Sequence, residues 1–270
     1  MSVYFVTGGL GSGKGLAALF QLKNYASNGL KIAGNLDIHL TNLIPNPNSK
    51  ISYIRVPDRP TQADLIALGS GNDGYDPDEN SLLVLDECAT WLNARNWNDK
   101  GRAGLIDWLI HSRKHGWDVL LLVQSFETLD KQIIDTLMEY HVSMNNLAKF
   151  NIPIVGKLLK GWTKKNRPLK LPTYHFGRVL YKNLVKADSW SFKGKEFYNS
   201  YNTKQIFTET NDFSSHCLLS NWHTTGRYLT QNIKFSIVRY LIINLLKFAY
   251  TISNTPKIHV PLIVKRHHSF

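Results

Sequence analysis

Residues 8–15 read Gly8-Gly9-Leu10-Gly11-Ser12-Gly13-Lys14-Gly15, a glycine-rich turn that follows the apolar run Val3–Thr7. A helical pattern, Gly13–Ser27, begins inside this turn. The order strand, glycine turn, helix is typical of a phosphate-binding loop, because glycines let successive backbone N–H groups point inward and the helix N-terminus adds its positive dipole. Lys14 is placed to contact the β- and γ-phosphates. All eight residues are therefore candidate nucleotide-binding residues.

The loop departs from the usual motif at its last position. The motif normally ends in Ser or Thr, whose hydroxyl helps to hold Mg²⁺. This chain has Gly15 there. The sequence thus predicts nucleotide binding and leaves efficient hydrolysis an open question.

A second part of the site is predicted where an apolar strand ends in two carboxylates. Residues Ser81–Leu85 are followed by Asp86 and Glu87. In a protein with a phosphate-binding loop, the first acid can hold Mg²⁺ through water and the second can polarise the attacking water. The alternative is an ordinary strand that ends in a solvated acidic turn. The preceding phosphate-binding loop favours the functional interpretation.

Two further residues are candidates for catalysis. Gln124 follows the apolar strand Asp118–Val123, where a polar side chain can contact the γ-phosphate or the attacking water. An ordinary glutamine in a strand-end turn is the alternative. Arg113 lies near the end of the helical pattern Arg102–His115, where cations complement the helix dipole. A second hypothesis makes Arg113 an arginine finger that reaches a neighbouring subunit.

The order of the predicted elements indicates an α/β fold. Thr61, with Asp64 three residues later, is typical of a capping box at the start of a helix. Strands alternate with helices, which implies a mostly parallel sheet covered by helices. The remaining predicted elements are the strands Lys31–Asn35 and Ile51–Val56, the helix Leu129–Glu139 and, beyond the alternating region, the strand-like run Thr173–Tyr181.

Charge divides the chain into two parts. Residues 1–150 carry 13 Lys/Arg against 16 Asp/Glu, whereas residues 151–270 carry 19 against 4. The basic second part suggests contact with an anionic surface, either nucleic acid or the inner leaflet of a membrane. Two cysteines far apart in sequence, Cys88 and Cys217, favour a reduced setting, with Cys88 packed beneath the acidic turn.

These motifs together resemble the zonula occludens toxin-like assembly proteins of filamentous phages. The resemblance extends from Val3 to about Tyr228. Besides the glycine loop, it rests on Asn35-Leu36-Asp37, Gly71-Asn72-Asp73, Leu83-Val84-Leu85-Asp86-Glu87-Cys88, Trp97-Asn98-Asp99-Lys100, Ile106-Asp107-Trp108, Gly116-Trp117-Asp118, Leu122-Val123-Gln124 and Gly226-Arg227-Tyr228. The resemblance implies a P-loop NTPase of the host inner membrane whose cytoplasmic N-terminal domain drives phage assembly. It also implies the partners: coat proteins, a single-stranded-DNA-binding protein and other phage assembly proteins.

The candidate membrane segment is 235–252. Eighteen residues of helix span about 27 Å, near the minimum for crossing a bilayer, but Arg239, Asn244 and Lys247 interrupt the segment. A helix lying on the membrane surface and a buried helix of a soluble protein are the alternatives. The resemblance favours an anchored protein. The predicted organisation is a nucleotide-binding core (1–150), a basic cytoplasmic extension packed on it (151–234), the apolar helix (235–252) and a short tail (253–270).

Three functions follow as hypotheses. The first is a membrane-associated, homo-oligomeric ATPase that uses ATP and Mg²⁺ to power the assembly and extrusion of phage. The second, motivated by Gly15, is a nucleotide-binding docking component that hydrolyses weakly or not at all. The third is a soluble translocase whose basic half contacts single-stranded DNA.

Overall fold

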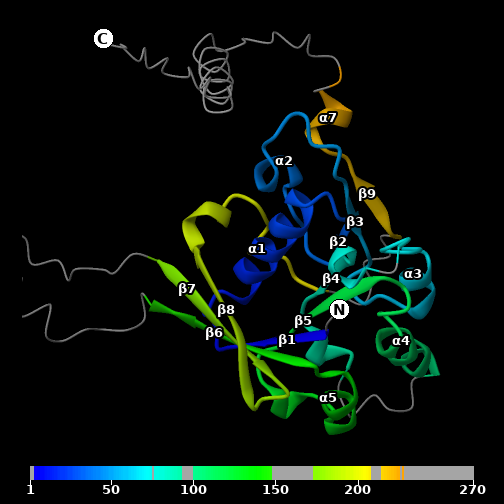
Figure 1. Ribbon diagram of the computed structural model, residues 1–270, viewed down its shortest axis with the longest axis vertical. Coiled ribbons are helices and arrows are strands. Elements are labelled where there is room, and N and C mark those ends of the chain that lie inside the picture. The colour runs from blue at the N-terminus through cyan, green and yellow to red at the C-terminus, as the bar shows by residue number, and fades with distance from the viewer. Residues whose placement is uncertain are drawn as a thin grey trace, which may run out of the picture. The chain divides into compact units, whose positions relative to one another are not determined.

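The computed structural model describes residues 3–74, 76–92, 100–147, 173–207, 214–225 and 227. Its centre is a nine-stranded sheet with the strand order β8-β7-β6-β1-β5-β4-β2-β3-β9 (Figure 1). The strands are β1 (Val3–Thr7), β2 (Ile32–Gly34), β3 (Tyr53–Arg55), β4 (Ser81–Leu85), β5 (Trp117–Leu122), β6 (Tyr140–Asn146), β7 (Tyr174–Tyr181), β8 (Val185–Lys193) and β9 (His216–Leu218). The six strands from β6 to β3 run parallel, and the pairings that involve β7, β8 or β9 are antiparallel. The predicted α/β fold with a mostly parallel sheet is confirmed.

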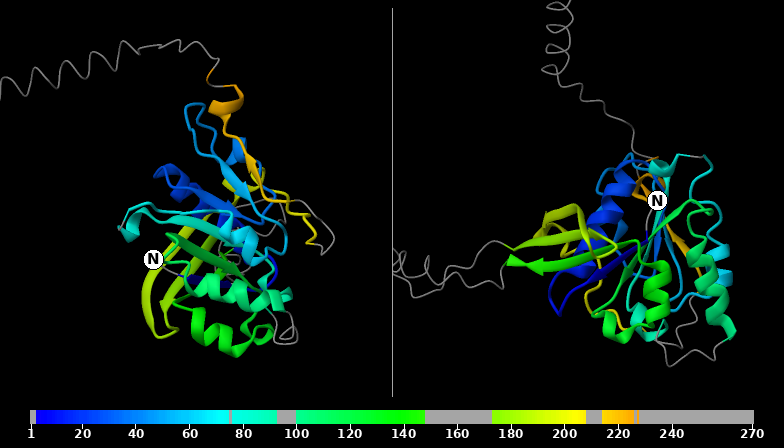
Figure 2. Two further views of the ribbon diagram at one scale, coloured as in Figure 1. Left: turned by 90° about the vertical axis from the view of Figure 1, so that its right-hand side faces the viewer. Right: turned by 60° about the horizontal axis from the view of Figure 1, so that its bottom comes forward.

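Helices cover both faces of the sheet (Figure 2). The described helices are α1 (Lys14–Ser27), α2 (Leu40–Leu43), α3 (Gln62–Ile66), α4 (Lys100–Ile110), α5 (Lys131–Leu137) and α7 (Asn221–Thr224), with short 3-10 turns at Pro77–Glu79, Cys88–Thr90, Phe126–Thr128 and Gly194–Phe197. Successive side chains of a strand point to opposite faces. Val6 and Leu122 accordingly pack with α1 in one core, while Phe5 and Leu121 pack with α3, α4 and α5 in the other. Burial on both faces explains the continuous apolar runs of the central strands.

Local sequence signals set most of the element boundaries. Strand β1 begins and ends where the sequence predicts, and Thr61 forms the expected capping box with Asp64. Helix α4 ends at Ile110, earlier than the predicted His115, and continues as irregular turns. The predicted stop at Gly116 is correct: its φ is 73°, and the N–H of the next residue donates back to the Ser112 carbonyl at 3.0 Å. This is a conformation that glycine adopts at low cost after a helix.

The predicted basic extension contributes strands to the same sheet as residues 1–150. Its described residues form β7, β8 and β9, and they belong to one compact unit that runs from Met1 to Arg227. The strand-like run predicted at 173–181 is confirmed as β7. Among the described residues, none of the helices combines the length and apolar content that crossing a bilayer requires. The candidate membrane segment 235–252 and the tail 253–270 lie outside the described residues.

Candidate nucleotide-binding site

The glycine-rich loop connects the carboxyl end of β1 to the first residue of α1, as the sequence predicts. Gly13 precedes the helix with φ 97°, a left-handed conformation that favours glycine. The Lys14 ammonium donates to the Gly8 carbonyl at 2.6 Å, so the lysine bends back over the loop. The first N–H groups of a helix have no carbonyl partner within it. The loop therefore places a cation and a helix N-terminus together, which is the arrangement that binds phosphate groups.

A buried histidine from the basic extension contacts the glycine-rich loop. His175 on β7 is buried, and its Nδ1 lies 2.9 Å from the Ser12 carbonyl oxygen. Its ring stacks on Phe192 of β8, with the ring centroids 5.5 Å apart. A Cβ atom at Gly13 would lie only 2.2 Å from the His175 Nδ1 atom. Only glycine therefore fits at position 13, for steric as well as conformational reasons.

The acidic turn after β4 lies at the same edge of the sheet as the loop. Strands β1, β5 and β4 are adjacent and parallel, so their carboxyl ends meet. Glu87 has a left-handed φ of 52°, unusual for a residue with a side chain, and its N–H donates to Asp86 Oδ1 at 2.7 Å. Its own carboxylate is exposed. The turn thus holds Asp86 inward and leaves Glu87 open to solvent.

Electrostatic contacts connect the turn to the loop. Burial raises the pKa of Asp86 to about 6, and the neighbouring Glu87 carboxylate adds to this rise. The Glu87 N–H and the Lys14 ammonium lower the pKa of Asp86 in turn. The predicted phosphate-binding lysine and the predicted Mg²⁺ ligand, 72 positions apart in sequence, are therefore close enough for their charges to interact.

A buried asparagine fixes the acidic turn from the neighbouring strand. Asn35 follows β2 and is fully buried. Its Oδ1 accepts the Asp86 N–H at 2.7 Å, and its Nδ2 donates to the carbonyls of Asp86 and Asp58 at 3.1 and 3.0 Å. Asn35 was not among the site residues predicted from the sequence. The sequence pattern that could have identified it is a polar residue directly after a buried strand.

The raised pKa of Asp86 predicts a pH-dependent stability. Because this pKa lies above the value of about 3.9 expected in the unfolded chain, the folded state holds the proton more tightly. The free energy of unfolding is therefore expected to fall by about 2 kcal/mol as the pH rises from about 4 to about 6. Urea unfolding of the wild type and of Asp86→Asn across this range measures the effect. The variant should lack this part of the pH dependence.

The matched control for this titration is Asp135→Asn, because Asp135 is exposed on α5. It should keep the wild-type dependence on pH. Equal pH profiles for the wild type and Asp86→Asn would contradict a raised pKa of the buried Asp86 carboxyl.

The structure places the other two candidate residues at opposite edges of the sheet. Gln124 is exposed just beyond β5, whose carboxyl end lies between those of β1 and β4, so it shares the edge of the loop. Arg113 is also exposed, but it precedes β5. Burial raises the pKa of Glu139, which precedes β6, and the charge of Arg113 opposes that rise. Arg113 therefore lies at the amino edge, away from the loop of its own chain. Its suggested action on a neighbouring subunit stays a prediction.

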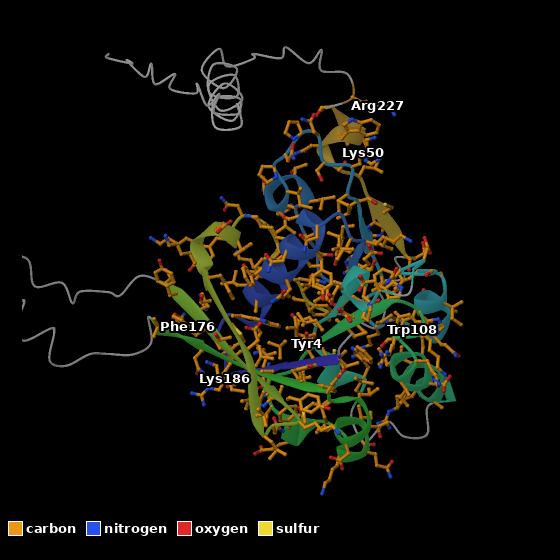
Figure 3. All side chains as sticks on the ribbon, viewed as in Figure 1. Tyr4, Lys50, Trp108, Phe176, Lys186 and Arg227 are labelled. Atoms are coloured by element: carbon orange, nitrogen blue, oxygen red, sulfur yellow. The ribbon has the colours of Figure 1, made fainter. Side chains whose placement is uncertain are left out.

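Other side chains near the motifs have structural roles. Trp108, on α4, is buried and stacks on His115, with ring centroids 5.4 Å apart (Figure 3). Cys88 is buried beneath the acidic turn, as predicted, and its thiol lies 3.1 Å from the Leu85 carbonyl oxygen. Both cysteines are free thiols. In the part of the chain that the structure describes, no three His, Cys, Asp or Glu side chains gather to form a metal site.

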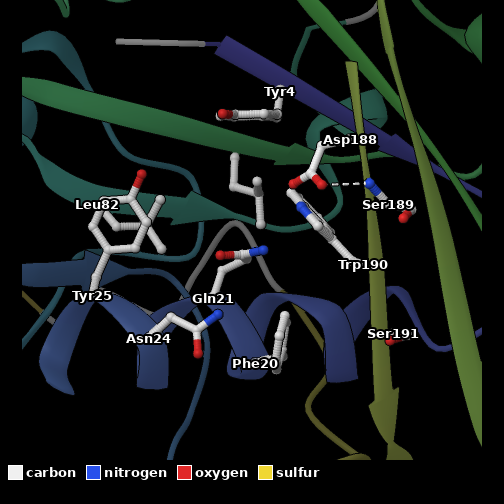
Figure 4. A pocket seen from close by; sticks show the side chains of 11 residues that line it. Tyr4, Phe20, Gln21, Asn24, Tyr25, Leu82, Asp188, Ser189, Trp190 and Ser191 are labelled. Atoms are coloured by element: carbon white, nitrogen blue, oxygen red, sulfur yellow. Dashed lines mark hydrogen bonds between the residues drawn. The ribbon is translucent and has the colours of Figure 1, made fainter. Parts of the chain in front are cut away.

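A cavity of about 440 Å³ lies between α1 and β8, apart from the glycine-rich loop (Figure 4). Tyr4, Tyr25 and Trp190 are among its lining residues, and none of residues 8–15 lines it. Tyr25 donates to Asp118 Oδ2 at 2.7 Å. Since Asp118 lies at the amino end of β5, this cavity is not part of the nucleotide site.

A phosphate-binding loop after β1, with an acidic turn after β4 at the same edge of a parallel sheet, defines the P-loop class of α/β proteins. Residues 2–179 match the family described as Zonular occludens toxin (Zot), and this chain belongs to that family. It is a homologue of the filamentous phage Gene 1 proteins. It is 39% identical over 289 residues to the Gene 1 protein of Enterobacteria phage fd, with all of this chain and 82% of that protein covered.

The chain is also similar to a Gene 1 protein of another phage and to solved structures. The chain is 41% identical over 232 residues to the Gene 1 protein of Salmonella phage IKe, covering 84% of this chain and 63% of that protein. Among solved structures, it is similar to the N-terminal domain of zonular occludens toxin from Neisseria meningitidis, with 17% identity, a TM-score of 0.37, and 75% of this chain and 100% of that chain covered. It is also similar to the genome packaging NTPase B204 from Sulfolobus turreted icosahedral virus 2 in complex with ATP-gammaS. That comparison has 11% identity and a TM-score of 0.36, and it covers 71% of this chain and 97% of that chain.

Proposed function

We propose that this protein is the P-loop ATPase that powers the assembly and extrusion of filamentous phage particles at the host inner membrane. The observation that carries the proposal is that the glycine-rich loop after β1 and the acidic turn after β4 meet at the carboxyl edge of one parallel sheet. One strand supplies the loop that binds phosphate, and another supplies the acid that faces it. Homology to the Gene 1 proteins supports the role in phage assembly.

The residues fit an ATP molecule with its Mg²⁺. Lys14 and the loop N–H groups bind the phosphates, and Asp86 provides a carboxylate of the kind that Mg²⁺ takes as an oxygen ligand. Mg²⁺ in such sites is held largely by phosphates and water, with one or two carboxylates, and Asp86 meets this need. When bound, the ion neutralises charge on the transferred phosphoryl group. Asp86 must be ionised for this role, which its pKa of about 6 allows at neutral pH.

Glu87 and Gln124 serve the attacking water. The exposed Glu87 carboxylate accepts a proton from that water, and Gln124 orients it or contacts the γ-phosphate. Arg113 lies too far along the sheet to act on its own loop. It instead reaches the site of a neighbouring copy in a homo-oligomer, where it stabilises negative charge as an arginine finger.

The partners proposed here are those that the family resemblance implies. Segment 235–252 anchors the protein in the host inner membrane, with the N-terminal domain in the cytoplasm. Coat proteins, a single-stranded-DNA-binding protein and other phage assembly proteins meet the complex there. The outer strands also expose an aromatic ring and cations: Phe176 and Arg178 lie two positions apart on β7, and Lys186 lies on β8. Such a surface suits contact with single-stranded DNA.

Gly15 supports a second candidate function. Without the usual hydroxyl at this position, the protein would bind nucleotide and act as a docking component of the assembly complex, with weak hydrolysis or none. Steady-state ATP hydrolysis separates the two candidates.

We expect the full chain to hydrolyse ATP in the presence of Mg²⁺. Glu87→Gln is expected to slow turnover at least about 100-fold, the range typical of a lost general base, while ATP still binds. The control Glu127→Gln changes an exposed acid in the Phe126–Thr128 turn and should leave the rate unchanged. ATP binding by the wild type without any turnover would favour the docking component instead.

A further inference from the structure

Gly15, the position that lacks the usual hydroxyl, faces a tyrosine from the basic extension. A Cβ atom at Gly15 would lie 3.2 Å from the Tyr201 hydroxyl oxygen and 3.4 Å from the ring atoms Cε2 and Cζ. The nearest atom to the place of a Ser or Thr side chain is thus itself a hydroxyl oxygen. It comes from a residue 186 positions further along the chain.

The backbone around Tyr201 is fixed against the segment that follows β2. Tyr201 forms an antiparallel bridge with Ile38. On either side of it, the Ser200 carbonyl accepts the His39 N–H at 2.8 Å, and the Asn202 N–H donates to the Asp37 carbonyl at 2.9 Å. These two hydrogen bonds form the bridge and hold the backbone of Tyr201 in position. Its place beside the loop is therefore built into the fold.

Gln205 strengthens the same connection. Its Oε1 accepts the Asp37 N–H at 2.8 Å, and its Nε2 donates to the Asn35 carbonyl at 2.9 Å. Asn35 is the residue that holds the acidic turn through Asp86. The segment that carries Tyr201 is thus attached to the same support as the predicted Mg²⁺ ligand.

The Tyr201 hydroxyl also interacts electrostatically with Asp86. Burial raises the pKa of Tyr201, and the Asp86 carboxylate raises it further. The phenol therefore stays neutral at physiological pH, when its oxygen can both donate and accept a hydrogen bond. The Tyr201 hydroxyl thus lies next to Gly15 and interacts with the charge of Asp86. A Ser or Thr hydroxyl at position 15 would have the same two neighbours.

We propose that the Tyr201 hydroxyl replaces the hydroxyl missing at Gly15. Beside the start of α1, it supplies the oxygen that contacts the hydrated Mg²⁺ of bound nucleotide. Mg²⁺ prefers oxygen ligands and retains several water molecules, so a neutral hydroxyl suits either the ion or its water. This inference rests on the proposed binding of ATP and Mg²⁺. It makes Tyr201 a positioning residue and Gly15 the residue that leaves room for its hydroxyl.

The competing explanation is that Tyr201 only fills the space left by Gly15. Phenylalanine preserves the ring and its packing but removes the oxygen, so Tyr201→Phe separates the two explanations. It also removes the atom nearest to a new Cβ at position 15, which makes room for serine. The double variant Gly15→Ser/Tyr201→Phe therefore returns a hydroxyl to this part of the site from the usual position.

The experiment is a titration of the full chain with ATP, once with excess Mg²⁺ and once with EDTA. The dissociation constant in EDTA divided by that in Mg²⁺ measures how strongly Mg²⁺ supports nucleotide binding. Tyr201→Phe is expected to lower this ratio about tenfold, as loss of a group that orients a metal ligand typically does. It should leave the affinity in EDTA unchanged, and the double variant should recover most of the ratio. Tyr198→Phe, an exposed tyrosine of the same segment, is the matched control and should change neither value.

Each outcome supports or overturns the inference. A full Mg²⁺ effect in Tyr201→Phe would overturn the role of its hydroxyl while leaving the proposed nucleotide site intact. The same conclusion follows if the double variant binds ATP in EDTA like the wild type but does not recover the ratio. If Tyr201→Phe weakens binding in EDTA as well, its role is in packing, and the inference is again overturned. A wild type that binds ATP under neither condition would overturn the proposed function together with this inference.

Discussion

Replacing Lys14 with alanine is expected to weaken ATP binding about 100-fold. The side chain lies over the glycine-rich loop, with its ammonium 2.6 Å from the Gly8 carbonyl oxygen and within the field of Asp86. Its loss removes a charge-assisted contact to the phosphates, worth up to about 3 kcal/mol, or about 100-fold in affinity. Titration with ATP, followed by calorimetry or by a fluorescent analogue, measures the change.

The control for this variant is Lys31→Ala. Lys31 is exposed just before β2, at the amino edge of the sheet, where its ammonium donates to the Ser70 carbonyl. Its removal should leave ATP binding unchanged. Wild-type affinity in Lys14→Ala would contradict the assignment of residues 8–15 as the phosphate-binding loop.

The second large effect is expected from Asn35→Ala, which should lower the free energy of unfolding by about 3 kcal/mol. Asn35 is fully buried, and its amide makes three hydrogen bonds to the backbone of Asp86 and Asp58. Alanine leaves these buried groups without their partner, at a cost of about 1–3 kcal/mol for each one left unsatisfied. Chemical denaturation with urea measures the loss. We also expect weaker binding of Mg²⁺-ATP, because the turn that carries Asp86 loses its support.

Asn24→Ala provides the comparison for this variant. Asn24 is exposed on α1, where alanine is a better helix former. Its replacement should change stability by no more than about 0.5 kcal/mol. A similarly small change in Asn35→Ala would show that the acidic turn does not depend on the buried amide.

Much of the site could be predicted from local sequence patterns. The loop at 8–15 and the acidic turn at 86–87 each follow an apolar strand, and parallel strands bring their carboxyl ends to one edge of a sheet. The structure confirms that the loop and the turn lie at the same edge of the sheet. The capping box at Thr61 was also predictable, because both of its partners lie within four residues.

The residues that complete the site could not be found in this way. His175 contacts the loop across 163 positions, and Tyr201 reaches Gly15 across an even longer separation. Neither residue belongs to a motif, and each takes its role from the antiparallel strand or bridge that positions it. The strand-like run at 173–181 was visible in the sequence, but its place beside β6 was not. Register between distant strands depends on pairing that leaves no local pattern.

The difference at the end of α4 has a similar origin. Cations at 113 and 114 and the glycine at 116 predict a helix that runs to His115. In the structure the last turn becomes irregular after Ile110, although the glycine still ends it with the expected left-handed conformation. Gly116 therefore predicted correctly where the turns after α4 end. It could not show where the regular hydrogen bonding of the helix ceases.

The most direct test of the proposed function is the release of phage particles by host cells in which this chain replaces the Gene 1 protein of a filamentous phage. Particle counts are compared for the wild type, Lys14→Ala and Glu87→Gln, with immunoblots showing equal amounts of each protein. We predict that the wild type supports release and that both variants strongly reduce it, because one binds ATP much more weakly and the other hydrolyses it much more slowly. Release at the wild-type level by either variant would contradict an ATP-driven role in assembly.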